Sequence, residues 1–338
     1  MNSQSAAQQG FVLVLTLWIL AIVTIAATYF AERVNRALDL ARQSRQNTQI
    51  LIDLADTRAE ILFRLGTTHM SVYGLGQGPD DSIYLDNRFY QGVGKDIVRL
   101  QDNRGLVNLN AVSDDRLHRL LGLLDIPAEQ RGRMIDTLRD YTDDDNLKRL
   151  NGAEEPEYAA LNLPPPRNDR LLTPFEPQRI LGWREVRLLW DDDRLPNLTT
   201  TSTSVALNPN TAPWPVLATL PGVTNEIAQA MITKRQLMPF TSGDQVAAMI
   251  GIPPQELFLQ IIVLPSDSVR VTQSAPGLPW ALQYNVSLTP NGDLAPWRID
   301  YYYKTRLTYK NDKVPNIPKL PPRSTIPLPL TPPFLSAF

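Results

Sequence analysis

The stretch that decides the fold is FVLVLTLWILAIVTIAATYFA, residues 11–31, which carries no charge. At about 1.5 Å of rise per residue, a helix of this length spans about 30 Å, the thickness of a bilayer's hydrocarbon core. The run passes without a break into ERVNRALDLARQSRQNTQILIDLADTRAEILFRLG, residues 32–66, where apolar residues recur at helical spacing among arginines and acids. This pattern predicts one long helix, first a membrane anchor and then an amphipathic packing surface.

The residues before the apolar run, MNSQSAAQQG, form a short polar leader that ends in Gly10. A secretory signal instead has a basic start, a shorter apolar core and a small-residue cleavage site after that core. Because the apolar run continues directly into the amphipathic segment, we expect it to remain in the mature chain as a single-pass anchor.

Beyond Gly66 the pattern changes to short β-type runs, 82–90 and 96–109, and such runs return only at 269–273, 280–294 and 295–310. Two alternating series flank Asn291-Gly292 and predict a hairpin of long strands. Their members are Leu282, Tyr284, Val286 and Leu288, then Trp297, Ile299, Tyr301 and Tyr303. We therefore expect one antiparallel sheet that is interrupted by a large helical insertion, residues 106–265.

The insertion repeats itself: the Asn-x-Asn motif at Asn108 and Asn110 recurs at Asn208 and Asn210. Each copy, about 106–140 and 205–260, predicts an extended segment, a helix, a tight turn and a second helix, as in helix-hairpin-helix or SAM-like domains. The asparagines suit turns and caps, so we expect a structural role for them. The expected fold class is α+β, with a long N-terminal helix packed on a small antiparallel sheet and an all-α insertion.

The order of these features (a prepilin-like start, a strand pair, DNRGLVNLN, a helical region with an acidic loop, a second LNPNTAP copy and final strands) resembles the K-type minor pseudopilin of type II secretion systems, a type IV pilin-like family. The resemblance implies that a prepilin peptidase cuts between Gly10 and Phe11 and that Phe11 is then N-methylated. Most pilins carry a glutamate at the fifth mature position, which pairs with a neighbour's N-terminal amine. Here that position is Leu15. A buried ammonium without a partner is costly, so Leu15 favours the tip of a filament, where no further amine needs pairing.

The resemblance further implies a minor pseudopilin that initiates or caps the pseudopilus and supports protein export across the outer membrane. Its expected partners are the I-type and J-type minor pseudopilins, with the H type as a further candidate, the major pseudopilin, the prepilin peptidase and the inner-membrane secretion platform. The expected location is the bacterial inner membrane, single-pass, with the bulk in the periplasm. The expected divisions are a leader, 1–10; the pilin helix, 11–66; the sheet's first part, 67–105; the insertion, 106–265; the sheet's second part, 266–312; and a proline-rich tail, 313–338.

An acidic loop in the insertion, DYTDDDNLKRLNGAEEPEY, residues 140–158, offers several hard oxygen ligands of the kind that Ca²⁺ prefers. It lacks the alternating ligand spacing of an EF-hand, and a solvated loop offset by Lys148 and Arg149 is the other interpretation. The family resemblance implies calcium in the inserted region. The candidate ligands are Asp140, Asp143, Asp145, Glu154 and Glu155.

The sequence shows no catalytic constellation: there is no cysteine, no Gly-x-Ser-x-Gly and no phosphate-binding glycine loop. We therefore expect no enzyme. The alternative function is a membrane-anchored DNA receptor, because LATLPGVTNEIAQAMITKR, residues 217–235, resembles a helix-hairpin-helix whose turn holds phosphates. Between residues 201 and 263, however, Lys234 and Arg235 stand against three acids, whereas DNA binding relies on clustered cations. We expect protein contact here and no nucleic acid.

Overall fold

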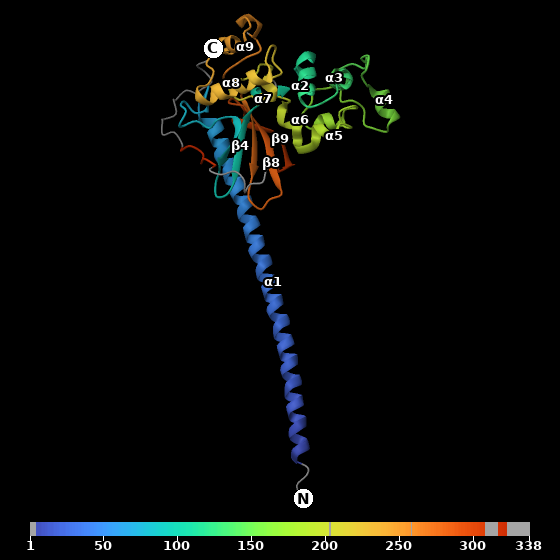
Figure 1. Ribbon diagram of the computed structural model, residues 1–338, viewed down its shortest axis with the longest axis vertical. Coiled ribbons are helices and arrows are strands. Elements are labelled where there is room, and N and C mark those ends of the chain that lie inside the picture. Colours follow the sequence, from blue (N-terminus) through green and yellow to red (C-terminus); the bar gives the residue numbers. More distant parts are fainter. Residues whose placement is uncertain (1–4, 203, 258, 308–316, 323–338) are drawn as a thin grey trace. The chain divides into compact units, whose positions relative to one another are not determined.

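The computed structural model describes residues 5–202, 204–257, 259–307 and 317–322. The chain divides into two units, Met1–Asp53 and Leu54–Phe338. Helix α1, Ser5–Thr67, forms the first unit and contributes its last turns to the second, which we call the head (Figure 1). Among the described residues, every buried side chain lies at or beyond Leu54, so the head holds its own cores. Of the expected tail, 313–338, only 317–322 lie within the described part.

Helix α1 changes character along its length, as its sequence predicts. It is the one helix in the described part of the chain that is long and apolar enough to cross a membrane, and its apolar residues from Val12 to Leu40 are exposed. In the head, Leu54, Thr57, Ile61 and Leu65 are buried at spacings of three and four residues, which places them on one face of the helix.

The head is built on a five-stranded antiparallel sheet of order β3-β4-β7-β8-β9. The strands are β3 (Asp86–Gln91), β4 (Ile97–Asp102), β7 (Ser268–Ser274), β8 (Trp280–Leu288) and β9 (Trp297–Arg306). A separate small hairpin, β1 (Met70–Ser71) and β2 (Gly74–Leu75), precedes them. Because β4 and β7 are neighbours in the sheet, everything between Asp102 and Ser268 is an insertion between two adjacent strands.

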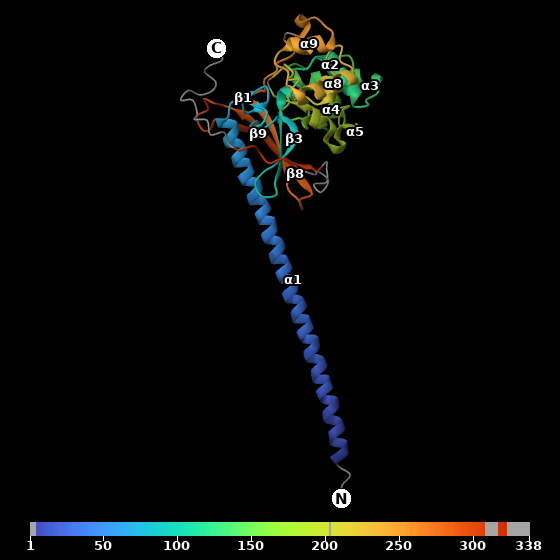
Figure 2. The same ribbon diagram turned by 60° about the vertical axis from the view of Figure 1, so that its left-hand side comes forward.

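The two faces of the sheet carry different partners. Val269, Val271, Tyr284 and Val286 form one core with Ile61 of α1, along with other residues of these elements. Arg270, on the opposite face of β7, donates hydrogen bonds to carbonyls of the insertion. Figure 2 shows the sheet between the last turns of α1 and the inserted helices.

The last hairpin differs from its prediction in two ways. Strand β8 ends at Leu288 and β9 begins at Trp297, so the connection is a longer loop; Pro290 and Pro296, which lack N–H donors, flank Asn291-Gly292 there. The register also shifts opposite Asn285 and Val286, which leaves Asp300 as an extra residue in β9. Trp297 consequently packs with the α1 core, whereas Tyr303 contacts Phe175 of the insertion.

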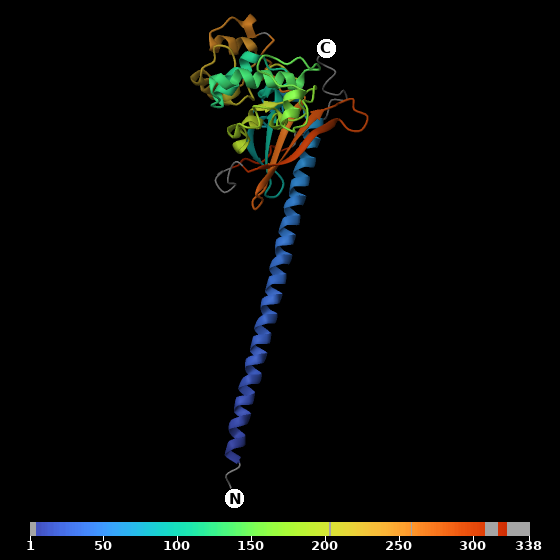
Figure 3. The ribbon, with the colours of Figure 1, turned by 90° about the vertical axis from the view of Figure 1, so that its right-hand side faces the viewer.

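The insertion has its own hydrophobic core, formed by short helices that Figure 3 shows gathered over one side of the sheet. The two-residue strands β5 (Val107–Asn108) and β6 (Thr199–Thr200) pair in parallel within it. Its helices are α2 (Asp114–Leu123), α3 (Ala128–Thr142), α4 (Glu155–Ala160), α5 (Arg187–Trp190), α6 (Arg194–Leu198), α7 (Trp214–Leu217), α8 (Asn225–Leu237) and α9 (Gly243–Ile250).

The two Asn-x-Asn motifs share a set of hydrogen bonds in both repeats. Asn108 accepts from the amide of Asn110, and Asn208 accepts from the amide of Asn210. The second asparagine then binds a distant segment through its side-chain oxygen and its side-chain nitrogen. Asn110 accepts from Leu171 N and donates to the carbonyls of Leu171 and Thr201. Asn210 accepts from Phe240 N and donates to the carbonyls of Phe240 and Val263. The expected structural role of these asparagines is confirmed.

The hydrogen bonds of the first Asn-x-Asn motif reach well past residue 140. Its Asn110 closes on Leu171 and Thr201, so the unit that matches the second repeat runs to Thr201 and contains the acidic loop as an excursion. The repeats meet where α2 faces α7: Arg116 donates to the hydroxyl of Thr219, and Arg119 donates to its carbonyl.

Candidate functional site

The predicted processing and tip residues all lie in the first unit. The backbone of Gly10 and Phe11 is helical within α1, and the side chain of Phe11 lies outside the described part. Leu15 is 48% exposed, like the apolar residues around it. The helix surface at this level is therefore a continuous apolar band, available to lipid or to neighbouring helices.

The acidic loop is drawn together by two segments, the end of α3 and the start of α4. Asp140, in the last turn of α3, is fully buried and accepts hydrogen bonds from the amide of Arg149. Gly152 lies so close to it that a Cβ there would stand 1.8 Å from Asp140 Oδ2. Glu154, which precedes α4, is only 3% exposed. The chain thus folds two carboxylates into the interior of a loop that its composition predicts to be solvated.

The remaining candidate ligands divide into two groups. Asp143 is half-buried and Asp145 is exposed, and both are close enough to raise the pKa of Glu154 by repulsion. Glu155 is exposed in the first turn of α4, and it is not among the charges that chiefly raise this pKa. The structure therefore brings together Asp140, Asp143, Asp145 and Glu154, and leaves Glu155 outside the cluster.

The acids of this cluster are partly buried and repel one another, and the nearby cations offset only some of them. Burial, followed by repulsion from Asp140 and Asp143, raises the pKa of Glu154 to about 7. Burial and repulsion from Asp145 likewise raise the pKa of Asp143. Lys148 pairs with Glu157 at 2.7 Å, and Arg149 lies 3.6 Å from Asp140. These two cations do not offset all the acids.

The unmatched oxygens of the cluster fit a bound cation. Among the described residues, both carboxylate oxygens of Glu154 and Oδ1 of Asp143 are buried without a hydrogen-bond donor. Such oxygens are costly unless they are protonated or coordinate a cation. In this arrangement no three Asp, Glu or His side chains of the described ranges already form a metal cage. A cation would therefore have to draw the carboxylates closer, with Glu154 and Asp143 as the first ligands.

A second polar centre, which the sequence analysis did not single out, lies where the sheet enters the insertion. The buried carboxylate of Asp102, at the end of β4, accepts hydrogen bonds on both of its oxygens. Oδ1 accepts from Arg104 N, Ser266 N and Ser266 Oγ, and Oδ2 accepts from Asn208 Nδ2 and Thr211 Oγ1. One side chain thus ties β4, the second repeat and the entry to β7 together. The DNRG motif is the sequence signal that could have revealed this centre.

The rest of the DNRG motif strengthens the same corner. Asn103 donates to Ser268 Oγ and Asn285 Oδ1, and Arg104 donates to the carbonyls of Leu264 and Pro265. A Cβ on Gly105 would come within 2.8 Å of the backbone of Thr211. The insertion is therefore fixed to the sheet by specific polar contacts.

The helix-hairpin-helix turn in the second repeat does not gather cations. Gly222, with φ of 72°, forms the turn between α7 and α8. Lys234 stacks over the ring of Phe240, and Arg235 donates to the carbonyls of Pro209 and Ala212. Both cations of this segment are thus engaged within the fold, which disfavours a role in phosphate binding.

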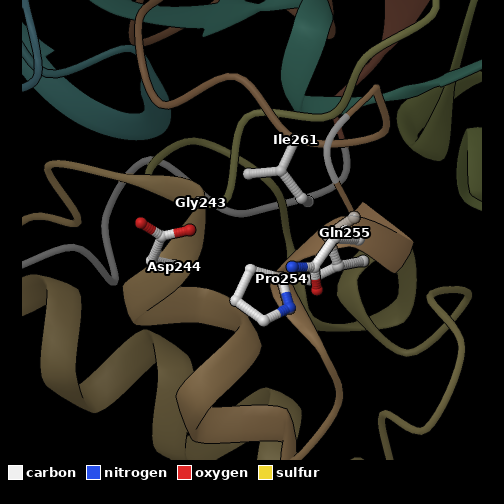
Figure 4. A pocket seen from close by; sticks show the side chains of 6 residues that line it. Gly243, Asp244, Pro254, Gln255 and Ile261 are labelled. Atoms are coloured by element: carbon white, nitrogen blue, oxygen red, sulfur yellow. The ribbon is translucent and has the colours of Figure 1, made fainter.

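The second repeat also carries a pocket between the start of α9 and the segment that follows it (Figure 4). Asp244 is the one ionisable residue among those that line it. A lone carboxylate in an otherwise apolar and amide lining offers no acid–base pair or metal cage. The lining residues are Gly243, Asp244, Pro254, Gln255, Leu257 and Ile261.

A membrane-compatible N-terminal helix whose end packs on an antiparallel sheet, with a helical domain inserted between two strands, defines a pilin-like protein with an enlarged head. Family models described as type II secretion system (T2SS), protein K match residues 96–188 and 207–258. These two segments of the chain are therefore similar to the protein K family of type II secretion systems. The first matched segment begins one residue before β4 and covers much of the first repeat, and the second segment covers most of the second repeat.

The fold is also found in a solved structure. A chain of the crystal structure of the GspK-GspI-GspJ complex from the enterotoxigenic Escherichia coli type 2 secretion system matches with a TM-score of 0.55 and 17% identity. The match covers 79% of this chain and 99% of that one. The expected fold class is thereby confirmed. No curated protein matches the sequence.

Proposed function

We propose that this protein is a minor pseudopilin of the K type and that it sits at the tip of the secretion pseudopilus, where it initiates or caps the filament. The observation that carries the proposal is Leu15, an apolar residue where a pilin-like subunit inside a filament needs an acid for its neighbour's N-terminal amine. The insertion supports it, because a domain between β4 and β7 enlarges the head and hinders a subunit stacked above. Neither feature hinders a subunit that has nothing above it.

The partners that follow are the I-type and J-type minor pseudopilins, with the H type and the major pseudopilin as further contacts. The relative in the solved structure is part of a complex of K, I and J proteins, which supports this choice. Before assembly the chain would lie in the inner membrane through α1, with the head in the periplasm. The prepilin peptidase would cut between Gly10 and Phe11 and methylate Phe11, and the inner-membrane platform would drive assembly.

The acidic cluster would hold one calcium ion in the assembled protein. Asp140, Asp143, Asp145 and Glu154 supply hard oxygen ligands, and the unmatched oxygens of Glu154 and Asp143 are the strongest support. A bound cation would join the end of α3 to the start of α4 and stabilise the excursion in the first repeat. Its role would be structural, and no reaction is proposed for the protein.

Labelling of isolated filaments tests the tip position. Antibodies against the insertion, detected with gold particles, should mark one end of each pseudopilus. Marks along the whole length would disprove the proposal. Intact-mass measurement of the membrane-extracted chain should show a mature protein that begins at Phe11 and carries one methyl group, in cells with an active prepilin peptidase.

A further inference from the structure

The sheet of the head has two edge strands, β3 and β9, and the chain covers the first with its own C-terminal segment. Gln91, the last residue of β3, bridges in parallel to Lys319. Its amide donates to the carbonyl of Pro318 at 2.8 Å, and its carbonyl accepts from the amide of Leu320 at 3.2 Å. Residues 318–320 therefore pair with the end of β3 through this one bridge.

The side chains of this segment fit the same arrangement. Leu320 is half-buried and packs against the core between α1 and the sheet, whereas Pro318 and Lys319 are exposed. On the side that faces away from β3, Pro321 has no N–H to offer a further strand, and Lys319 is charged. Proline and lysine are the residues by which proteins block pairing at an exposed edge. The segment can thus pair inward with Gln91 but offers little to a strand approaching from outside.

Strand β3 without this cover would be open to pairing. Asp86–Gln91 contains no proline or glycine and includes Phe89 and Tyr90, which favour extended structure. An exposed edge of this kind is a template for addition of another strand.

We propose that the β3 edge is a docking surface for an extended segment, and that residues 317–322 occupy it in cis to prevent pairing between copies of this chain. Two backbone hydrogen bonds and one half-buried leucine hold the segment, so a competing strand can displace it. The partner excluded in this way is the β3 edge of a second copy. The inference goes beyond the proposed tip function, because it depends on the head alone.

Two truncations of the soluble part, from Arg42 onward, test the proposal. One ends at Asn316 and removes the covering segment, and the other ends at Pro322 and keeps it. Hydrogen exchange measured by mass spectrometry should show at least ~10-fold faster exchange at the end of β3 in the first truncation only, because Gln91 loses its acceptor. Light scattering should show dimers or larger species for that truncation, and a synthetic peptide of residues 313–322 should reverse both changes.

Two point variants guard against a general folding defect. Leu320→Asp places a charge against the core and should reproduce both changes, whereas Lys319→Asp alters an exposed side chain and should not. Equal exchange in the two truncations would show that the segment does not cover the edge. Faster exchange without association at the same protein concentration would show that the segment does not prevent pairing between copies at the β3 edge. Either result would overturn the proposal.

Discussion

At the scale of single residues, Glu154 is a carboxylate whose surroundings disfavour its negative charge. It is buried beside other acids, and within the described part of the chain neither of its oxygens has a hydrogen-bond donor. Its pKa of about 7 means that, without a cation, folding favours the protonated acid. Calcium would remove this conflict by neutralising the charge that burial opposes.

Without metal, the head should lose stability as the pH rises from about 4.5 to about 7. The folded-state pKa of Glu154 lies above its ordinary value, so folding takes up a proton in this window, and the stability present at low pH is lost as the pH passes the folded-state pKa. Glu154→Gln keeps the shape and removes the charge. In chelator at pH 7 we expect it to raise the Tm by a few degrees. Thermal melts at several pH values measure both effects.

Calcium should raise the Tm of the wild-type head, because a ligand that binds only the folded state stabilises it. Glu154→Gln should reduce that shift strongly. Glu155→Gln, one residue along the chain and outside the cluster, is the matched control and should retain it. An unchanged melting temperature at millimolar calcium would rule the site out. An equal loss in both variants would show that the cluster is wrongly assigned.

At the scale of elements, a group of buried polar contacts joins β4 to the insertion. Asp102 alone accepts five hydrogen bonds from residues between 104 and 266. A buried carboxylate whose oxygens are all hydrogen-bonded fixes the positions of its donors, whereas one that loses these donors destabilises the fold. The orientation of the insertion on the sheet therefore depends on this side chain.

Asp102→Asn should destabilise the head by about 2–4 kcal/mol, because the new NH₂ group faces donors that the carboxylate had matched. Denaturant unfolding of the soluble part measures the loss. Asp267→Asn, at an exposed acid beside the same corner, should change stability by no more than about 0.5 kcal/mol. Similar values for the two variants would contradict the structural role of Asp102.

The sequence predicted those elements whose signal is local. The long helix was recognisable because its apolar run and amphipathic continuation are periodic, and the Asn-x-Asn repeats because short motifs recur. The bulge at Asp300 was not predicted, since one extra residue leaves the alternation looking regular. The closure of Asn110 on Leu171 was also missed, because it joins residues that the acidic excursion separates. The pairing of Lys319 with Gln91 contradicts no local rule, but proline-rich composition alone favours an unpaired extended chain.

At the scale of the whole molecule, Leu15 and the insertion concern the same question, which is what can stand above this subunit. In a pilin-like filament, each N-terminal amine is buried among apolar helices and needs an acid from its neighbour. A subunit with Leu15 cannot supply that acid. The free energy that would disfavour it inside a filament is absent at the tip, so the proposed position rests on this side chain together with the size of the head.

Leu15→Glu should therefore impair this protein if it works at the tip. With no amine above it, the new carboxylate is an unpaired charge in an apolar helix, at a cost of about 2.5–3.5 kcal/mol. We expect at least ~10-fold fewer pseudopili in cells whose only copy carries the change. Leu17→Glu places the same charge where no amine is expected, either inside a filament or at its tip, and should reduce the number of pseudopili by a similar factor. Leu15→Ala should leave that number within about twofold of wild type. Inside a filament the carboxylate introduced by Leu15→Glu would meet an amine, so this variant alone would escape the loss. Filament counts in which Leu15→Glu assembles normally while Leu17→Glu fails would place this subunit below another one and refute the tip assignment.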